Sequence, residues 1–273
     1  MCSHRSDDRP RPTNAAEGNL SVTPAHLQSH ASVRFEWGLS GAVALGASDI
    51  SVVVDVLSFT TTLSVAADRG IEVLPYWARD DSAAEYAARH DAVLAVGRSR
   101  AEAGEVSLSP RTVRDADNLH RLVLPSPNGS SIAYLPATSS TVVVGACLRN
   151  ATAVAAWIAE VLSEGATVAV IAAGEKWPDG SLRPCVEDLW GAGAVLADVL
   201  VRRPELTAST EAEMAVAAWH AVRGNVNSSL EACASGRELI DMGYESDVAV
   251  AAEVDRSATV PVLVGDRFVD HSG

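Results

Sequence analysis

Short hydrophobic runs recur along the chain, and most of them lack the polar alternation expected of a sheet face in contact with water. Uninterrupted runs of Val, Ile, Leu and Ala are typical of parallel strands covered on both faces. We therefore predict strands at residues 33–37, 51–54, 71–75, 92–96, 121–124, 141–145, 167–172 and 260–264.

Segments of helical composition separate these runs. They lie at residues 63–68, 82–90, 132–135, 151–162, 189–201, 211–222, 229–233 and 247–254. The alternation predicts an α/β fold, with a mainly parallel sheet and helices on both faces. We expect two α/β lobes, residues 33–140 and 141–273, with the functional site between them. Residues 1–32 are polar and predict a disordered or loosely attached extension.

The most informative stretch is the strand at 51–54, which ends at Asp55 and is followed by a turn rich in hydroxyl groups. Ligands of open α/β sheets bind at the carboxyl ends of strands, and the next helix presents free N–H groups there. Asp55 with Thr60 and Thr61 therefore indicates a site for a metal-bound oxyanion. The pattern is equally compatible with threonines that cap the helix and an aspartate that stabilises the turn.

The strand at 121–124 leads into a second candidate anion site, Asn128-Gly129-Ser130. Asn-Gly is foremost a tight-turn signal. Here it lies between a strand and a helix, where a glycine followed by hydroxyl groups also suits an anion. Both interpretations stay open.

Further polar groups follow the strand at 167–172. Gly174 begins a glycine-rich loop, and Glu187 and Asp188 precede the next apolar helix. Acidic residues in a first helical turn suit the helix dipole, but adjacent carboxylates are also ligands that Mg²⁺ prefers.

Composition narrows the classes of partner. The chain has 273 residues, with 21 Lys and Arg against 35 Asp and Glu, for a formal charge of −14. This balance argues against nucleic acid and against an anionic membrane as main partners, but not against a small anionic substrate. A homo-oligomer stays an expectation that the sequence does not test.

The four cysteines indicate the compartment. Cys2, Cys147, Cys185 and Cys233 are scattered without metal-ligand spacing, as expected of reduced thiols. There is no apolar run of membrane-spanning length and no hydrophobic signal region. We expect a cytoplasmic protein.

The order of the motifs resembles that of the 2-phosphosulfolactate phosphatase family over most of residues 52–264. The first is Val53-Val-Asp55-Val-Leu-Ser-Phe-Thr60-Thr-Thr, which is similar to the family's Val-Ile-Asp-Val-Leu-Arg-Ala-Thr-Thr-Thr. The others are Asp115-Ala-Asp-Asn118, Ser126-Pro-Asn128-Gly-Ser130, Gly145-Ala-Cys-Leu-Arg-Asn150, Ala172-Ala-Gly174, Glu187-Asp188, Gly191-Ala-Gly193, Ser235-Gly-Arg-Glu-Leu239, Asp247-Val and Val260-Pro-Val.

The resemblance implies Mg²⁺-dependent hydrolysis of a phosphomonoester on a small anionic skeleton. Asp55 with Glu187 or Asp188 would hold the metal and serve in catalysis, and Arg98 would bind a substrate carboxylate or sulfonate. The remaining substrate-binding candidates are Thr60, Thr61, Asn118, Asn128, Gly129, Ser130 and Gly174.

The chain departs from the family pattern near the site. Ser58 replaces an Arg, the family's Gly-Glu-Arg is reduced to Gly97-Arg98, and Asn-Ser-Pro becomes Asn118-Leu-His120. Loss of an Arg removes a bidentate donor for anions. Two alternatives therefore stay open: a catalytically silent relative that binds a small anion, and a hydrolase for another phosphoester or a phosphonate.

Overall fold

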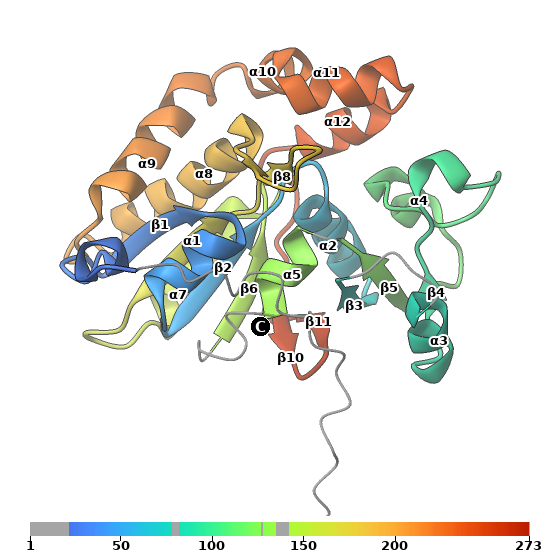
Figure 1. Cartoon of the computed structure of the whole chain (residues 1–273). Coiled ribbons are helices and arrows are strands. Elements are labelled where there is room, and N and C mark those ends of the chain that lie inside the picture. The colour runs from blue at the N-terminus through green and yellow to red at the C-terminus, as the bar shows by residue number, and fades with distance from the viewer. Residues whose placement is uncertain (1–21, 78–81, 127, 135–141, 273) are drawn as a thin grey trace, which may run out of the picture.

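The computed structural model describes residues 22–77, 82–126, 128–134 and 142–272. They form a nine-stranded sheet with the strand order β1-β7-β2-β6-β10-β11-β3-β5-β4 (Figure 1). The strands are β1 (Val33–Trp37), β2 (Ile50–Val54), β3 (Glu72–Tyr76), β4 (Val93–Leu94), β5 (Arg121–Pro125), β6 (Val142–Ala146), β7 (Val168–Ala172), β10 (Pro261–Val264) and β11 (Arg267–Asp270). A small hairpin, β8 (Glu175–Lys176) with β9 (Leu182–Arg183), stands apart from the sheet.

Two groups of parallel strands make up the sheet. β1, β7, β2 and β6 form one group, and β3, β5 and β4 form the other. The antiparallel hairpin β10–β11 lies between them and pairs with β6 and β3. The predicted mainly parallel α/β fold is confirmed.

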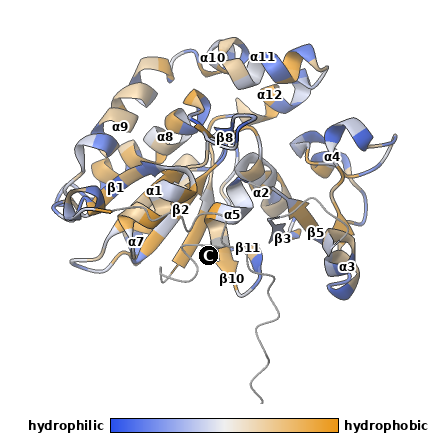
Figure 2. Cartoon of the chain, viewed as in Figure 1, coloured by the Kyte–Doolittle hydropathy of each residue, from blue (hydrophilic) through white to orange (hydrophobic). Residues whose placement is uncertain are grey.

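Helices cover both faces of the sheet, as predicted. They are α1 (Gly38–Leu45), α2 (Phe59–Asp68), α3 (Ser82–Arg89), α4 (Pro110–Asp115), α5 (Gly129–Tyr134), α7 (Ala151–Val161), α8 (Val186–Arg202), α9 (Thr210–Val222), α10 (Val226–Ala232), α11 (Ala234–Asp241) and α12 (Glu245–Ala251). Figure 2 shows the hydrophobic residues concentrated on the strands, whereas exposed helices such as α4 are largely hydrophilic.

The core follows the two-residue period of the strands. In β2, Val52 and Val54 pack into the cluster formed with α7 and α8, whereas Val53 packs with α2 on the opposite face. β6 and β7 divide their side chains in the same way. Strands with apolar residues on both faces must be covered on both, and this explains the uninterrupted runs in the sequence.

The predicted lobe boundary at residue 140 does not coincide with a break in the sheet. β1 and β2, from the range assigned to the first lobe, pair with β7 and β6 from the second. The reason is that a parallel sheet pairs strands according to its crossovers, so neighbours in space need not be neighbours in sequence.

Residues 22–32 are more ordered than the predicted extension. Pro24–Leu27 forms a short 3₁₀ helix, and Gln28 is buried, with its amide donating to the Phe35 carbonyl at 2.9 Å. The buried Arg34 guanidinium also donates to the Leu27 carbonyl at 3.0 Å. Residues 1–21 lie outside the described part of the chain, so the prediction for them stays a prediction.

Candidate active site

The carboxyl ends of β2, β5 and β7 meet at one edge of the sheet and enclose a cavity of about 100 Å³. Asp55 follows β2 directly, and Gly174 and Ser126 follow β7 and β5. The cavity is lined by Asp55, Leu57, Ser58, Phe59, Arg98, Leu108, Leu124, Pro125, Ser126, Asn128, Gly174, Glu175, Cys185, Glu187 and Asp188.

Asp55 is held by the start of α2. Its Oδ1 accepts a hydrogen bond from the Phe59 amide at 3.2 Å. A Cβ atom on Gly129 would lie 2.8 Å from Oδ2 and would also meet the Phe59 ring. Only glycine at position 129 therefore leaves room for this carboxylate.

Asp188 joins the ends of two strands. Its Oδ1 accepts from the Val56 amide at 2.7 Å, and its Oδ2 accepts from the Gly174 amide at 2.8 Å. The Gly174 amide is thus occupied by a protein carboxylate. The first turn of α8 places Asp188 and its neighbour Glu187 in the cavity wall.

Burial and like charges raise the proton affinity of this site. Burial, with the charges of Glu175 and Glu187, raises the pKa of Asp55 to about 7, although the Phe59 amide and Arg98 oppose the shift. Burial and the charges of Asp55 and Glu187 also raise the pKa of Asp188. Crowded carboxylates of this kind are relieved by a proton or a bound cation.

The donor atoms fit a hard divalent cation only in part. Within the described ranges, no group of three or more His, Cys, Asp and Glu side chains has the arrangement of a metal site. Mg²⁺, however, commonly takes one or two protein carboxylates and completes its shell with water and substrate phosphate. Asp55 and Glu187 supply oxygen ligands of the required type on the cavity wall.

Arg98 is the cationic side chain among the described lining residues. It lies in the 3₁₀ turn Arg98–Arg100 after β4, where its Nε donates to Asp247 Oδ2 at 2.7 Å. Its Nη2 donates to the hydroxyl group of Ser58. Ser58 therefore lies at the guanidinium of Arg98, at the position where the family pattern has an arginine.

The structure brings together most of the predicted site residues. Those that line the cavity are Asp55, Arg98, Asn128, Gly174, Glu187 and Asp188. Gly129 lies directly beside Asp55, and its amide donates to the Ser126 hydroxyl at 3.2 Å.

Thr60 and Thr61 are fully buried, do not line the cavity and bind backbone groups of the turn after β2. The Thr60 hydroxyl donates to the Asp55 carbonyl at 2.8 Å and accepts from the Asp55 amide at 2.9 Å. The Thr61 hydroxyl donates to the Val56 carbonyl at 2.7 Å. These hydrogen bonds agree with the alternative in which the threonines have a structural role, and the predicted role in substrate binding stays a prediction.

Ser130 and Asn118 also lie outside the cavity lining. The buried Ser130 hydroxyl donates to the Leu124 carbonyl at 3.3 Å, so it secures the start of α5. Asn118 is exposed in the connection from α4 to β5, with a φ of 53°, a conformation that asparagine tolerates better than most residues. Its predicted role in substrate binding stays a prediction.

Several residues of the site were not predicted. Ser126, Glu175 and Cys185 line the cavity. Asp247 does not line it, but its carboxylate accepts a hydrogen bond from Arg98. Ser126 and Glu175 directly follow a strand end and the Gly174 turn, a signal that the sequence does contain. Asp247 is on α12, far from Arg98 in sequence, and no local pattern links the two.

The cysteine thiols are poor nucleophiles here. Burial raises the pKa of both Cys147 and Cys185, which keeps these thiols protonated near neutral pH. Cys147, Cys185 and Cys233 are all unpaired and buried.

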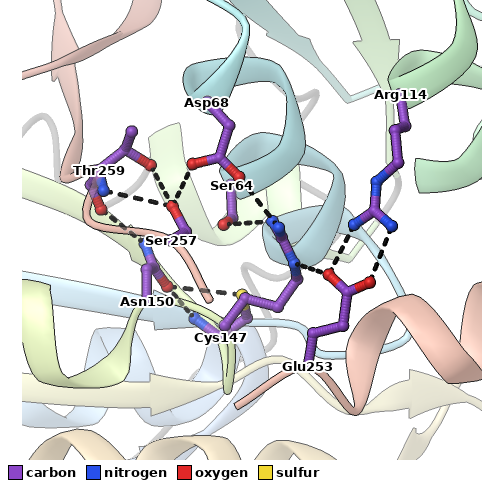
Figure 3. A network of polar contacts seen from close by, with 9 residues as sticks. Ser64, Asp68, Arg114, Cys147, Asn150, Glu253, Ser257 and Thr259 are labelled. Atoms are coloured by element: carbon purple, nitrogen blue, oxygen red, sulfur yellow. Dashed lines mark hydrogen bonds and ion pairs between the residues drawn. The ribbon is translucent and has the colours of Figure 1, made fainter. Parts of the chain in front are cut away.

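A second polar network, drawn in Figure 3, fastens α2 to its surroundings. At its centre the buried Arg149 donates to Ser64, Asp68 and Glu253 at 2.8, 2.9 and 3.1 Å. Arg114 on α4 adds a bidentate pair to Glu253 at 2.8 and 2.6 Å. The network supports the helix whose first turn holds Asp55.

The site defines a class of protein: an α/β protein that binds a small ligand among acidic groups at the carboxyl edge of a parallel sheet. None of the helices in the described residues has the length and hydropathy needed to cross a membrane.

Comparison with known proteins identifies the family. The family model for 2-phosphosulpholactate phosphatase matches residues 42–266. A probable 2-phosphosulfolactate phosphatase of Thermus thermophilus is 33% identical over 220 residues, covering 80% of this chain and 89% of the relative. A 2-phosphosulfolactate phosphatase of Methanothermobacter thermautotrophicus is 29% identical over 221 residues, covering 81% and 89%. The chain belongs to the 2-phosphosulpholactate phosphatase family and is a phosphatase.

Proposed function

We propose that the protein hydrolyses a phosphomonoester of a small anionic acid, such as 2-phosphosulfolactate, to sulfolactate and phosphate. The observation that supports this most directly is the convergence of Asp55, Glu187 and Asp188 with the single arginine of the described lining. The names of the relatives support the choice of substrate.

Mg²⁺ is the proposed cofactor. Asp55 and Glu187 would hold it, while Asp188 keeps the ends of β2 and β7 in register through its two backbone hydrogen bonds. When bound, Mg²⁺ supplies charge neutralisation for the phosphoryl group and a water of lowered pKa. Relief of the repulsion between buried carboxylates favours its binding.

The protein's own groups bind and orient the substrate. Asn128 and Ser126 offer hydrogen bonds to phosphoryl oxygens from the end of β5, and Arg98 offers N–H groups to a carboxylate or sulfonate. The Phe59 and Leu124 side chains form apolar parts of the wall, which limits water around the reacting bond.

Ser58 favours a second candidate within the same class, a hydrolase for a different small phosphoester or a phosphonate. Because Ser58 accepts from Arg98 Nη2, it takes up a donor that would otherwise be available to an anionic substrate. Substrate preference is therefore expected to depend on this residue. We also propose a cytoplasmic location, in agreement with the unpaired cysteines.

The test is phosphate release by the purified protein from 2-phosphosulfolactate and from a panel of small 2-phospho acids and phosphonates, with Mg²⁺ and with chelator. Turnover that requires Mg²⁺ and is fastest on 2-phosphosulfolactate is the expected result. Faster turnover of another panel member would favour the second candidate. No turnover of any compound by folded protein would contradict both and leave a silent anion-binding relative.

A further inference from the structure

Asp247 is a buried carboxylate that lies behind the cavity wall. It is in the first turn of α12, and both its oxygens are used: Oδ2 accepts from Arg98 Nε at 2.7 Å, and Oδ1 accepts from the Ser109 hydroxyl. Ser109 immediately precedes α4, and Arg98 follows β4. One side chain on α12 thus fixes two segments that are distant from it in sequence.

Two of the three guanidinium nitrogens of Arg98 donate to protein groups. Nε is held by Asp247, and Nη2 donates to Ser58, which also lines the cavity. Within the part of the chain that the structure describes, Nη1 makes no hydrogen bond. The Arg98 side chain is 18% exposed, and its Cζ lies 6.0 Å from the centroid of the Tyr244 ring, which covers it from α12's side.

Because of the charges around the cavity, the orientation of the Arg98 guanidinium affects the binding of an anionic group. Asp55, Glu175, Glu187 and Asp188 line the cavity with Arg98. A carboxylate or sulfonate on the substrate is repelled by whichever of these acidic side chains are ionised, and among the described lining residues Arg98 is the cationic group that attracts it. Its binding therefore depends on where the Arg98 guanidinium points.

We propose that Asp247 is a positioning residue that fixes Arg98 to bind the carboxylate or sulfonate of the substrate, with Ser58 holding the second guanidinium nitrogen. The proposal rests on the proposed function, because it takes the ligand to carry such a group besides the phosphoryl group. With Nε held by Asp247 and Nη2 held by Ser58, Nη1 is the nitrogen left for an anionic group, so the guanidinium is preorganised for binding.

Equilibrium binding separates this role from a merely structural one. The probes are sulfolactate, which has a carboxylate and a sulfonate, and inorganic phosphate, which has neither; both are titrated in MgCl₂ by calorimetry. Asp247→Asn is expected to weaken sulfolactate binding by about tenfold, equivalent to about 1.4 kcal/mol, and to leave phosphate binding within about twofold. Asp241→Asn, at an exposed site on α11, is the matched control.

Two further variants keep the proposal testable if Asp247→Asn does not fold. Ser109→Ala removes only the second partner of Asp247 and is expected to weaken sulfolactate binding in the same direction, by a smaller factor. In an Arg98→Gln background, Asp247→Asn is expected to have no further effect on the ratio of the two affinities, as a double-mutant cycle requires when one residue acts through the other.

Equal weakening of both probes in Asp247→Asn and in Ser109→Ala would overturn the proposal, as would unchanged sulfolactate binding in both. Wild-type protein that binds phosphate but not sulfolactate would also overturn it. If the proposed function is wrong, wild-type protein releases no phosphate from any phosphoester. The ratio of the sulfolactate and phosphate affinities still tests the role of Asp247 in that case.

Discussion

At the scale of single residues, two aspartates of the site have different surroundings and therefore different roles. Both oxygens of Asp188 accept from backbone amides, whereas the Asp55 carboxylate accepts from the Phe59 amide through Oδ1. A carboxylate that holds two strand ends is needed for the fold. Asp55 lines the cavity, and its Oδ2 accepts no hydrogen bond from the described residues, so this carboxylate is available for a metal or substrate.

Asp188→Asn is expected to lower the free energy of unfolding by about 1–3 kcal/mol. The amide NH₂ group would face one of the two backbone N–H donors, at Val56 or Gly174, and leave it unsatisfied. Urea unfolding of the variant beside wild type measures the change. A variant as stable as wild type would show that these backbone hydrogen bonds contribute little.

Asp55→Asn is expected to change the pH dependence of stability in metal-free protein. The pKa of Asp55 is raised from 3.8 to about 7, so between these values the native state keeps a proton that the unfolded state releases. The free energy of unfolding contributed by this group therefore falls as the pH rises from about 4 to about 7.

The check is urea unfolding of wild type and Asp55→Asn from pH 4.5 to 8 in chelator. The free energy of unfolding of the variant should increase relative to that of wild type as the pH rises. Taking the difference cancels the opposite contribution of groups such as Glu253, whose pKa is lowered mainly by the Arg114 hydrogen bond. A difference that does not depend on pH would contradict the assigned shift.

Gly129→Ala is expected to abolish phosphate release, because the added Cβ would meet the Asp55 carboxylate and the Phe59 ring. Gly224→Ala is the matched control, since nothing lies within 4 Å of a Cβ at that position. Steady-state assays of both variants, with circular dichroism to verify folding, measure the effect. Wild-type activity in a folded Gly129→Ala protein would show that Asp55 does not have to lie where the structure places it.

At the scale of elements, α2 is fixed at both ends. Its first turn is bound to Asp55, and its last turn reaches the Arg149 network through Ser64 and Asp68. Ser257, in the segment between α12 and β10, donates to Asp68 at 2.5 Å and extends the network to that segment. The helix that positions Asp55 is thus anchored to α4, α12 and β10.

Arg149→Met is expected to lower the free energy of unfolding by about 3 kcal/mol, because it leaves Asp68 and Glu253 without their shared partner. The control is Arg202→Met, which removes an exposed pair with Asp198 on α8 and should cost less than about 1 kcal/mol. Urea unfolding compares the two. Similar losses in both variants would mean that the buried network adds no particular stability.

At the scale of the whole molecule, the periodicity of apolar residues predicted the parallel strands because they are buried on both faces. It missed β11, although Gly265-Asp266 between β10 and β11 is a dipeptide typical of tight hairpin turns. It also missed α1, whose Gly-rich sequence favours a loop by propensity and which forms by packing on the sheet.

The site was predictable mainly where its residues follow strand ends. Asp55, Arg98, Asn128 and Gly174 satisfy that rule, whereas Glu187 and Asp188 were predicted from an acidic first helical turn. The buried roles of Thr60 and Thr61 were not predictable, since a hydroxyl group beside a turn suits a ligand and a backbone carbonyl equally well. The Asp247–Arg98 pair depends on how α12 packs against α4 and reaches the turn after β4, a long-range arrangement that no local spacing encodes.

The proposed function requires the Asp55 carboxylate at the end of β2 to support metal-dependent phosphate release. The most direct measurement is kcat on 2-phosphosulfolactate as a function of Mg²⁺ concentration for wild type, Asp55→Asn and the exposed control Asp241→Asn. We predict saturable Mg²⁺ dependence in wild type and control, and a loss of at least about 10³-fold in Asp55→Asn. Equal Mg²⁺-dependent turnover in all three proteins would contradict the proposed role of Asp55.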